Sequence, residues 1–596
     1  MSLNLLNKFL VFFFRTNKLG ELTLNQVGEK VCISGWLEFK RGGFFTLRDS
    51  TGSCQIVCNI EYKLPEKESI VNVEGMVRAR PEKDRNPKMK TGDIEVVCSN
   101  MTVLNDCKRR PFTVSKFITT KEETRMRYRY IDLRNTAMQR NLRLRSSFIL
   151  KLRRFLCERR GFVDVETPTL FRRTPGGAKE FIVPTRKPGK FYSLPQSPQQ
   201  YKQLLMVGGI DRYMQIAKCY RDEGAKADRQ PEFTQLDLEM SFTNQDEIKQ
   251  LVEDALVESW PEELSSISAP FPCMSYHDAI NLYGTDKPDT RYGFVVKDLS
   301  ELLKDITIFQ YASSLSIRGI CFTDGCEKLT SKQIKTIQGN VRKQHSLRLT
   351  VVQIGENKKW IYPGAQDIFP VNTMDQVNDY LGVKEGDVIC LCANRQWQKA
   401  CMALGKARTM AASYYEENGH PLWDKDTYNF LWVEDFPLFE IDDEDRLHSA
   451  HHPFTAPATE DYEHLVPHPM EATKVRGQHY DLVLNGSEIG GGSMRIHDAA
   501  TQRYILEVML KEDCSELEHL LEALESGCPP HGGIALGLDR LIAIMCDALS
   551  IRDVIAFPKS TEGTDLMTGA PCELSQVDLD TYKVSVTKKE NTNKED

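Results

Sequence analysis

Residues 219–242 read CYRDEGAKADRQPEFTQLDLEMSF, and this stretch decides the fold. The pattern predicts a strand, a long polar loop and a return strand on which polar and apolar residues alternate, so that the polar side chains share one face. A half-buried antiparallel sheet with solvent on its polar side would give the same alternation. That alternative leaves unexplained why one face gathers an arginine, two amides and three carboxylates beside the loop. We therefore expect a site here, with the candidate residues Arg221, Glu223, Arg229, Gln230, Phe233, Gln235, Asp237 and Glu239.

A second segment, SLPQSPQQYKQLLM at residues 193–206, predicts a turn followed by the start of a helix. The spacing places Gln199 and Lys202 on one face of that helix. A lysine at this position can neutralise a small carboxylate, although a lone lysine is more often a surface residue.

The third segment is DLVLNGSEIGGGSMRIH at residues 481–497, and GGIALGLDRL at 532–541 follows it. Asp481 and Glu488 offer two carboxylates beside a predicted glycine-rich turn, which suits magnesium held together with substrate phosphates. The glycines permit close approach of the backbone, although a plain turn is the simpler explanation of the run. Arg540 lies near a predicted helix start, where the helix dipole helps to hold a terminal phosphate.

Composition excludes several other classes of protein. The chain has 596 residues, 41% of them hydrophobic, and a net charge of −7, so any contact with nucleic acid must be local. The P-loop motif G-x-x-x-x-G-K-[ST] and the motif HExxH are both absent from the sequence. The 17 cysteines include no C-x-x-C pair, so we expect reduced thiols and no zinc site. His451 and His452 could form an acid–base pair, but no nearby Cys or Ser completes a nucleophile constellation.

The region 31–104 reads as five short strands separated by glycine-rich or charged breaks, which is typical of a small closed OB barrel that binds single strands. Phe44, Arg48 and Gln55 lie in its first hairpins, where an aromatic ring and polar groups can read an unpaired base. Packing in the core is the alternative for a phenylalanine in a strand.

The first 20 residues, MSLNLLNKFLVFFFRTNKLG, contain no acidic residue, and Lys8, Arg15 and Lys18 flank an apolar stretch. That stretch is too short to span a bilayer, and no basic residue precedes Lys8 as a secretory signal would require. These features favour a mitochondrial presequence over a non-functional extension. No later segment predicts a membrane span.

Further along the chain, RMRYRYIDLR predicts a basic hinge that leads into a helix whose apolar residues recur at helical spacing until Gly161. GFVDVETPTL then predicts a strand that Pro168 stops. Between residues 291 and 425 the composition changes to mixed helix and strand with few chemical clusters, which predicts an inserted domain. The polar tail after Gly563 ends in KKENTNKED, which predicts a disordered end.

Taken together, these segments resemble the class II aminoacyl-tRNA synthetases, and among them the aspartyl-tRNA synthetases of bacterial and mitochondrial type. GFVDVETPTL resembles motif 1, YRDEGAKADRQPEFTQLDLE motif 2 and GLDR motif 3, while QSPQQYKQ and GGGSMRIH mark the aspartate subgroup. The resemblance covers residues 21–571. It implies an α+β fold with an N-terminal OB-fold β-barrel, an antiparallel-sheet catalytic domain and an inserted α+β domain. The expected divisions are a presequence (1–20), an anticodon-binding barrel (21–112), a hinge (113–140), a catalytic domain in two parts (141–290 and 426–560), an insert (291–425) and a C-terminal extension (561–596).

The resemblance also implies a role for each candidate residue. The catalytic residues would be Arg221 and Arg540. The ATP-binding residues would be Arg221, Asp222, Glu223, Gln230, Phe233, Glu488, Gly537, Leu538, Asp539 and Arg540. The aspartate-binding residues would be Gln199, Lys202, Arg221, Asp237, His451 and Arg495, with the Arg495 fork gripping a carboxylate bidentately. Mg²⁺ would be bound by Asp481 and Glu488, and the anticodon by Phe44, Arg48, Gln55 and Glu95.

On this resemblance the chain would activate L-aspartate with ATP to aspartyl-adenylate and pass the aspartate to the 3′ end of tRNA(Asp), without a protein nucleophile. Its partners would be tRNA(Asp), L-aspartate, ATP with Mg²⁺ and a second copy of the chain, bound through motif 1 around Pro168. The leader would direct it to the mitochondrial matrix. A bacterial-like cytoplasm is the alternative if residues 1–20 are no presequence.

Two other functions stay open. A synthetase for asparagine or lysine would share the barrel and the motifs, although Arg495 would repel the ammonium group of lysine. A non-catalytic RNA-binding paralogue usually loses the phosphate ligands, whereas Arg221, Glu488 and Arg540 are present. Gly176 stands where bacterial members commonly have Glu, which removes a candidate partner for the substrate ammonium group, and charging of tRNA(Asn) as well stays open.

Overall fold

The computed structural model describes residues 15–58, 64–114, 120–173, 178–224, 226, 228–304, 306, 315–362, 368–442 and 444–587. These residues form two compact units. The first holds the chain up to Arg143 together with residues 556–560 and 564–571. The second holds Leu144–Ile555 and most of the remaining C-terminal residues.

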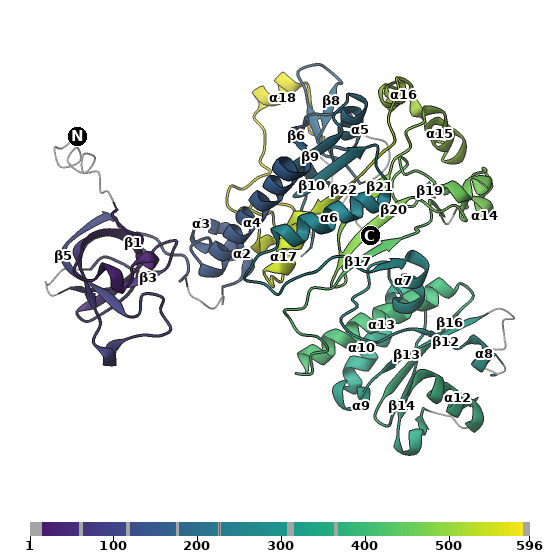
Figure 1. The fold of residues 1–596 in the computed structure, drawn as a ribbon, viewed down its shortest axis with the longest axis horizontal. Helices are drawn as coiled ribbons and strands as arrows, with labels where there is room; N and C mark the ends of the chain where they lie inside the picture. Colours follow the sequence, from purple (N-terminus) through teal and green to yellow (C-terminus); the bar gives the residue numbers. More distant parts are fainter. Residues whose placement is uncertain are drawn as a thin grey trace, which may run out of the picture. The chain divides into compact units, whose positions relative to one another are not determined.

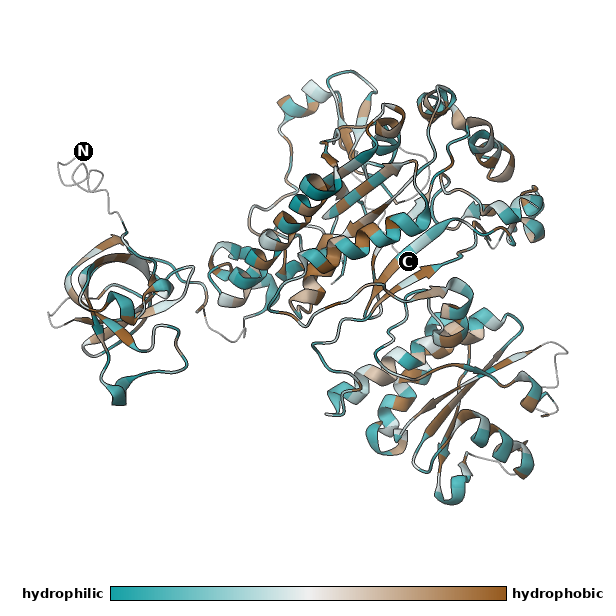
Figure 2. Ribbon diagram, in the orientation of Figure 1, coloured by the Kyte–Doolittle hydropathy of each residue, from teal (hydrophilic) through white to brown (hydrophobic). Residues whose placement is uncertain are grey.

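Five strands of the first unit form a closed barrel in the order β1-β2-β3-β5-β4 (Figure 1). They are β1 (Lys30–Arg41), β2 (Phe44–Arg48), β3 (Ser53–Cys58), β4 (Ile70–Ala79) and β5 (Ile94–Asn105). Buried residues alternate with more exposed ones along most of β1, as the two-residue period of a strand requires. The inward side chains, among them Val31, Ile33 and Leu37, form one apolar core, and Figure 2 shows hydrophobic residues recurring along the barrel strands. The predicted OB barrel is confirmed.

The barrel core includes residues that precede β1. The Leu19 side chain is fully buried in that core. Its N–H donates to Asp49 Oδ2 at 2.9 Å, and Arg15 forms an ion pair with the same carboxylate at 3.1 Å. The predicted leader boundary at residue 20 is therefore wrong, because residues 15–20 pack with the barrel. The rest of the predicted leader, residues 1–14, lies outside the described residues.

Removing residues 1–20 is expected to destabilise the barrel by about 2–4 kcal/mol, because loss of the Leu19 side chain leaves a cavity in the core. A chain that begins at Arg15 keeps Leu19 and is expected to be more stable by this amount than the chain that begins at Glu21. Urea unfolding followed by tryptophan fluorescence compares the two truncations. Equal midpoints would contradict the assignment of Leu19 to the core.

Helices follow the barrel in the same unit: α2 (Glu122–Arg127), α3 (Arg129–Asp132) and the start of α4 (Thr136–Arg154). The buried Asp132 accepts hydrogen bonds from Arg125 at 2.9 Å and from Arg129 at 2.6 Å. Arg134 reaches back to Glu68 of the barrel at 3.0 Å. Several arginines of the predicted basic hinge are therefore held by buried carboxylates rather than presented to a ligand.

The second unit contains an eight-stranded sheet in the order β11-β17-β20-β21-β22-β10-β9-β6 (Figure 1). Its inner strands are antiparallel, and only the edge strands β11 and β6 pair in parallel. The strands are β6 (Val163–Asp164), β9 (Arg212–Tyr220), β10 (Glu232–Ser241), β11 (Cys273–Ser275), β17 (Phe430–Glu434), β20 (His479–Leu484), β21 (Ser487–Met494) and β22 (His531–Gly537). Apolar residues of the sheet share one core with α4, α6 (Gln245–Ser259) and α17 (Leu538–Met545). The predicted antiparallel sheet is confirmed.

The predicted strand in GFVDVETPTL is present but short: it is the two-residue edge strand β6, which pairs with β9 and ends before Pro168. The predicted position of the glycine-rich turn is wrong. The glycine run 490–492 lies inside β21 rather than at a turn. The turn before it is Asn485-Gly486, where both residues have the positive φ of a two-residue hairpin turn. A Cβ on Gly491 would lie 2.5 Å from a carboxylate oxygen of β20, so glycine leaves room for that group.

A five-stranded antiparallel sheet forms the insert, in the order β12-β13-β16-β14-β15. Its elements are β12 (Lys297–Asp298), α8 (Ser300–Leu303), β13 (Ser316–Phe322), α9 (Gly325–Lys328), α10 (Ser331–His345), β14 (Thr350–Ile354), β15 (Trp360–Ile361), α12 (Val371–Leu381), β16 (Val388–Asn394) and α13 (Trp397–Glu417). Arg408 of α13 is fully buried and donates to three backbone carbonyl oxygens at 2.6–2.9 Å. The acceptors are Asp289, Tyr292 and Phe294. These bonds fasten the segment that enters the insert onto α13.

Smaller elements complete the second unit. They are β7 (Ile182–Pro184), β8 (Phe191–Ser193), α5 (Gln199–Val207), α7 (Tyr276–Tyr283), β18 (Phe439–Ile441), β19 (Leu447–Ser449), α14 (Pro469–Ala472), α15 (Ala499–Arg503), α16 (Glu518–Glu525) and α18 (Gln576–Tyr582). The predicted disordered end falls largely on residues 588–596, outside the described residues. Within the part of the chain that the structure describes, no helix is long and apolar enough to cross a membrane.

Candidate functional site

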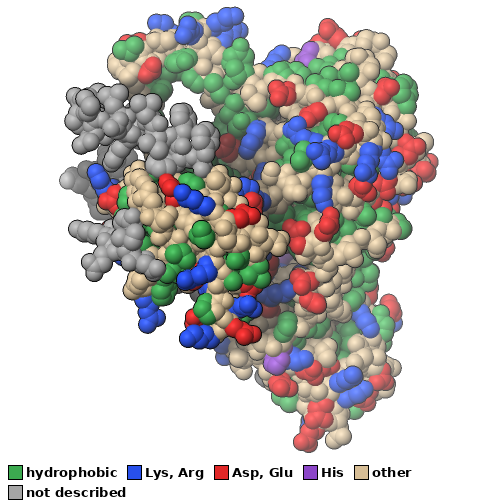
Figure 3. All heavy atoms as spheres, turned by 60° about the vertical axis from the view of Figure 1, so that its left-hand side comes forward, with side chains coloured by type: hydrophobic (Ala, Val, Ile, Leu, Met, Phe, Trp, Pro, Cys, Tyr) green, Lys and Arg blue, Asp and Glu red, His purple; other side chains and the backbone are tan. Residues whose placement is uncertain are grey.

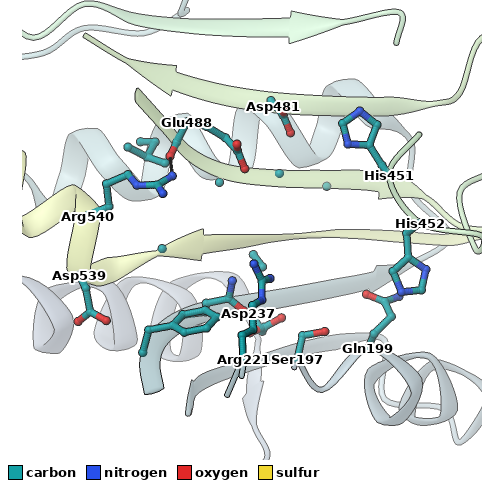
Figure 4. A pocket seen from close by; sticks show the side chains of 18 of the residues that line it. Ser197, Gln199, Arg221, Asp237, His451, His452, Asp481, Glu488, Asp539 and Arg540 are labelled. Carbon is teal, nitrogen blue, oxygen red and sulfur yellow. Dashed lines mark hydrogen bonds between the residues drawn. The ribbon is translucent and has the colours of Figure 1, made fainter. Parts of the chain in front are cut away.

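A cavity of about 580 Å³ lies on the polar face of the eight-stranded sheet, and most of the candidate residues line it (Figure 4). The lining candidates are Gln199, Lys202, Arg221, Glu223, Arg229, Gln230, Phe233, Gln235, Asp237, His451, Asp481, Glu488, Arg495, Gly537, Asp539 and Arg540. Figure 4 shows Glu488 and Arg540 at one end of the cavity and Gln199, His451 and His452 at the other. The cavity therefore has two chemically distinct ends.

Two arginines that line the cavity, Arg221 and Arg540, have N–H donors for a ligand. Arg221 follows β9, and its guanidinium carbon lies 5.1 Å from the ring centroid of Phe233. Its buried Nε has no hydrogen-bond partner among the described residues. Arg540 of α17 donates to the backbone oxygen of Glu488, and its Nη2 lies 3.7 Å from Asp228 Oδ2. Both guanidinium groups can therefore donate to an anionic ligand.

Three candidates near this end do not present side chains freely. Asp539 accepts the N–H of Thr234 at 2.8 Å and pairs with Arg145 of α4 at 2.5 Å, so both of its oxygens hold the start of α17 in place. Leu538 is fully buried in the main core, and Asp222 does not line the cavity. The side chains of Leu538 and Asp222 therefore do not line the cavity, and their roles in binding ATP stay predictions.

Asp481 and Glu488 come from the neighbouring strands β20 and β21. Asp481 Oδ1 lies 2.9 Å from His479 Nε2, and burial raises the pKa of Asp481 to about 6. Glu488 pairs with Lys287 at 3.4 Å. Among the described residues, no group of three His, Cys, Asp or Glu side chains could hold a metal ion. The pair still suits Mg²⁺, which keeps several waters and takes one or two carboxylates together with substrate phosphates.

Four charged side chains are buried together towards the other end of the cavity. Lys202 Nζ lies 3.2 Å from Asp237 Oδ1 and 3.2 Å from Glu239 Oε2. Arg495 Nε donates to Glu239 Oε1 at 2.9 Å. Burial opposes ionisation of Glu239, but the charges of Arg495 and Lys202 outweigh it and lower the pKa of Glu239 to about 2. Two cations thus face two carboxylates, and their formal charges cancel.

The N–H groups that remain for a ligand in this cluster come from Arg495 and Lys202. The Nε and Nη2 edge of Arg495 faces Glu239, and Nη1 donates to Ser493 Oγ at 2.6 Å. In this arrangement Glu239 occupies the Nε and Nη2 edge of Arg495, so the predicted bidentate grip on a ligand would need another edge of the guanidinium or a rearrangement. One N–H of Arg495 Nη1 therefore has no acceptor in this cluster. Lys202 has three N–H donors and two carboxylate partners, so one of its N–H donors is also left for a ligand. Glu239 is among the candidates that the strand pattern predicts, on the polar face of Asp237, but it is absent from the aspartate-binding set that the resemblance implies.

The histidines beside this cluster are neutral. The His451 and His479 rings stack, with their centroids 3.6 Å apart. Burial lowers the pKa of His451 to about 4, with the charge of His479 adding to the shift. Burial and the nearby charges of Arg495 and Lys202 lower the pKa of His452 to about 3. Neither His451 nor His452 carries a proton to donate near pH 7.

His452 is expected to make the protein less stable as the pH falls below 6.5. The unfolded chain binds a proton at this side chain near pH 6.5, whereas the folded protein excludes it until about pH 3. The contribution is complete above pH 6.5 and declines by about 1.4 kcal/mol per pH unit below it. His452→Gln is expected to flatten the pH dependence of the urea midpoint between pH 6.5 and 4 by this amount. An unchanged slope would contradict a neutral buried imidazole.

The outer surface of the barrel brings together three of the four expected anticodon residues. Gln55 donates to Glu95 Oε2 at 3.0 Å, and Arg78 donates to the other oxygen of Glu95 at 3.0 Å. Phe44 is half-buried, and its ring lies 6.5 Å from that of Phe39, which is 41% exposed. Phe39 is a second aromatic ring that the expected set omits. The surface combines rings for stacking with an oriented amide.

Arg48 does not belong to that surface. It is buried and pairs with Glu68 at 3.0 Å and with Glu38 at 3.5 Å. These carboxylates hold the guanidinium within the protein, and the contact of Arg48 with a base stays a prediction.

The fold and the cavity define a class of protein that the comparisons identify. Residues 121–561 match the tRNA synthetases of class II (D, K and N), and residues 31–104 match the OB-fold nucleic acid binding domain. The chain therefore belongs to the class II tRNA synthetases of the D, K and N family.

The individual relatives that the chain resembles are named as aspartate–tRNA ligases. The chain is 49% identical to the mitochondrial aspartate–tRNA ligase of Rattus norvegicus, over 97% of this chain and 91% of that protein. It is 47% identical to the mitochondrial aspartate–tRNA ligase of Homo sapiens, over 98% and 92%. It is 41% identical to the aspartate–tRNA(Asp/Asn) ligase of Opitutus terrae, over 94% and 96%.

Solved structures share the fold at lower sequence identity. A putative aspartyl-tRNA synthetase from Leishmania major matches with a TM-score of 0.56 at 19% identity, covering 92% of this chain and 95% of that one. Asparaginyl-tRNA synthetase from Pyrococcus horikoshii, complexed with asparaginyl-adenylate, matches with a TM-score of 0.54 at 18% identity, covering 91% and 97%.

Proposed function

We propose that the chain activates L-aspartate with ATP and transfers the aspartate to the 3′ end of tRNA(Asp). The observation that carries this proposal is the buried cluster at one end of the cavity. Lys202 and Arg495 each keep one donor there, and two donors without a facing acceptor match a carboxylate side chain. The names of the Rattus and Homo relatives support the same substrate.

The first step would join the substrate carboxylate to the nucleotide. An oxygen of the aspartate α-carboxylate attacks the α-phosphorus of ATP, the bond to the β-phosphate breaks, and pyrophosphate leaves. Arg221, with its unpartnered Nε, would bind the α-phosphate and the α-carboxylate as charge develops between them. Phe233 would stack on adenine, Glu223 and Gln230 would hold its polar edge, and Arg540 would bind the γ-phosphate.

The second step would release the nucleotide. The terminal ribose hydroxyl of the tRNA attacks the acyl carbon, the bond to AMP breaks, and the hydroxyl proton leaves with the phosphate. His451 and His452 are uncharged near pH 7. Positioning and fixed charge would therefore carry the catalysis rather than a protonated side chain of the protein.

Mg²⁺ fits the carboxylates of Asp481 and Glu488, with Gly491 leaving room for the Asp481 side chain. When bound, the ion would neutralise negative charge on the ATP phosphates. Lys287, which pairs with Glu488, would keep that carboxylate oriented.

Selection of the amino acid would follow from the same cluster. The amide nitrogen of asparagine would face two N–H donors, and the ammonium group of lysine would face two cations, so both would bind poorly. Asp237 Oδ2 has no hydrogen-bond partner among the described residues and would accept from the substrate ammonium group, together with Gln199.

An amino-acid-dependent ATP–pyrophosphate exchange assay tests the proposed function. A chain that begins at Arg15 is expected to catalyse exchange with aspartate and with none of the other amino acids. Reactions without amino acid provide the baseline. Exchange with asparagine or lysine, but not with aspartate, would overturn the proposal.

The remaining partners follow from surfaces outside the cavity. Phe44, Gln55 and Glu95 would read the anticodon, with Phe39 as an added stacking ring. A second copy of the chain would cover the apolar residues around the exposed Pro168, because large apolar side chains gather there. These are Val163, Leu170, Ile182 and Phe191, between 47% and 54% exposed.

Location and tRNA range are also proposals. The names of the Rattus and Homo relatives support action in the mitochondrial matrix. The Opitutus relative is named for tRNA(Asp/Asn), so the alternative is that the chain charges both tRNAs. Aminoacylation assays with a tRNA(Asp) transcript and with a tRNA(Asn) transcript distinguish the two cases.

A further inference from the structure

Positive charge that binds RNA must be gathered locally in this protein, because the chain carries a net charge of −7. Figure 3 shows Lys and Arg interspersed with Asp and Glu on the face that it presents. The insert departs from this mixture at α10, which reads SKQIKTIQGNVRKQH and contains no Asp or Glu.

The cations of α10 lie on one side of the helix. Ile337 and Val341 are buried in the core of the insert, with Ile334 packed against it. At 100° per residue, the Lys and Arg side chains fall within an arc of about 100° on the opposite side. We call this set the α10 stripe: Lys332, Lys335, Arg342 and Lys343, all exposed. The stripe is about 16 Å long at 1.5 Å per residue.

Among the residues that the structure describes, no carboxylate forms an ion pair with the stripe. Other cations of the insert form ion pairs, such as Lys328 with Asp324 at 2.8 Å and Lys358 with Asp379 at 3.7 Å. Among the described residues, none of the ion pairs of the insert includes a member of the stripe. The four charges are therefore available to a ligand.

The neighbouring helix adds to the positive charge. Asn418, which ends α13, donates to Gln333 Oε1 at 3.1 Å near the start of α10. At the other end of α10, burial and the charge of Lys406 on α13 lower the pKa of His345. The two helices therefore lie antiparallel, and Lys406 approaches the end of α10 that carries Arg342 and Lys343.

Helix stability explains only half of the stripe. Cations in the last turn, such as Arg342 and Lys343, complement the partial negative charge of the helix C-terminus. Lys332 lies in the first turn, where the helix dipole disfavours cations, and Lys335 lies one turn further on, where the dipole no longer acts. Lys332 therefore acts against the stability of its own helix and Lys335 gains nothing from the dipole, which points to a ligand. Gly339 lies between the two pairs, and no atom lies within 4 Å of the position that a Cβ would occupy there, so a backbone can approach closely.

We propose that the α10 stripe binds the sugar–phosphate backbone of the tRNA acceptor arm, an inference that rests on the proposed function. The chain enters and leaves the insert beside β11 and β17, which belong to the sheet that carries the cavity. The 3′ end of the tRNA has to reach that cavity, so the acceptor arm is the part of the RNA nearest to the insert. A stripe of about 16 Å spans several phosphates of one strand.

Charge reversal tests the interaction. R342E/K343E is expected to weaken binding of a tRNA(Asp) transcript at least tenfold at about 0.1 M salt and to lower the salt slope of log K by about 2. The matched control K358E/K359E reverses two exposed charges elsewhere on the insert and is expected to change the affinity less than twofold. Aspartate-dependent exchange, which needs no tRNA, is expected to stay unchanged in both. Equal tRNA affinities of the two variants would overturn the proposal.

A second variant separates binding from folding. K332Q/K335Q removes one cation that the helix dipole disfavours and one that it does not affect, so it is expected to leave the melting temperature equal or higher while weakening tRNA binding. A melting temperature that falls together with affinity would overturn the assignment of these lysines to RNA. An acceptor-arm minihelix is expected to show the same loss as the whole tRNA, and an unchanged minihelix affinity would overturn the choice of arm. Failure of the proposed function has a different signature, because the unmodified chain would then lack aspartate-dependent exchange.

Discussion

Replacing Arg495 by leucine is expected to lower kcat/KM for aspartate in the exchange reaction by about 10³–10⁴-fold while the affinity for ATP changes less than threefold. The variant removes one of the two donors that the cluster leaves for the substrate side chain. It leaves Arg221 and Arg540 untouched. Equilibrium binding of ATP and exchange at varied aspartate concentration measure the two effects separately.

Arg495 is buried, so the leucine variant also loses stability, by about 3–5 kcal/mol, because Glu239 keeps only Lys202 as a partner. Arg495→Lys is the matched control. It retains a cation beside Glu239 but lacks Nη1, and we expect it to fold with a melting temperature near that of the unmodified chain and still lose most aspartate activity. Aspartate activity within tenfold of the unmodified chain in either variant would refute the role of Nη1.

Replacing Arg221 by alanine is expected to reduce aspartate-dependent exchange by about 10³-fold, chiefly in kcat, because the guanidinium would meet charge that develops at the α-phosphorus. Arg229→Ala is the matched control from the same loop. Arg229 is 54% exposed in its side chain and pairs only with Glu223 among the described residues, so its loss is expected to cost less than tenfold. Similar losses in both variants would show that the loop, rather than Arg221, carries the effect.

Local patterns predicted the parts of the site that lie within one element. The alternation along β10 places Asp237 and Glu239 on one face, and the helical spacing of α5 brings Gln199 and Lys202 to the same cavity. The five short strands of the barrel follow from periodicity and breaks in the same way. In each case the information lies within about ten neighbouring residues.

Pairings across the fold escaped prediction because no local pattern encodes them. Arg495 meets Glu239 across 256 positions, and that contact decides which edge of the guanidinium is free. Arg48 looks like an exposed cation on a strand, yet Glu68 reaches it from another part of the barrel. Leu19 looks like the end of a leader, yet it fills the barrel core.

The buried Arg408 changes what should count as the insert. Composition draws its first boundary at residue 291, but the carbonyl of Asp289 accepts one of the bonds from Arg408 at 2.7 Å. An insert excised at residue 291 would carry a buried guanidinium short of one acceptor, a defect of about 1–3 kcal/mol. The stable insert therefore starts before residue 291, in the part of the chain that composition assigns to the catalytic domain. An insert transplanted into another synthetase would have to include Asp289 to keep this hydrogen bond.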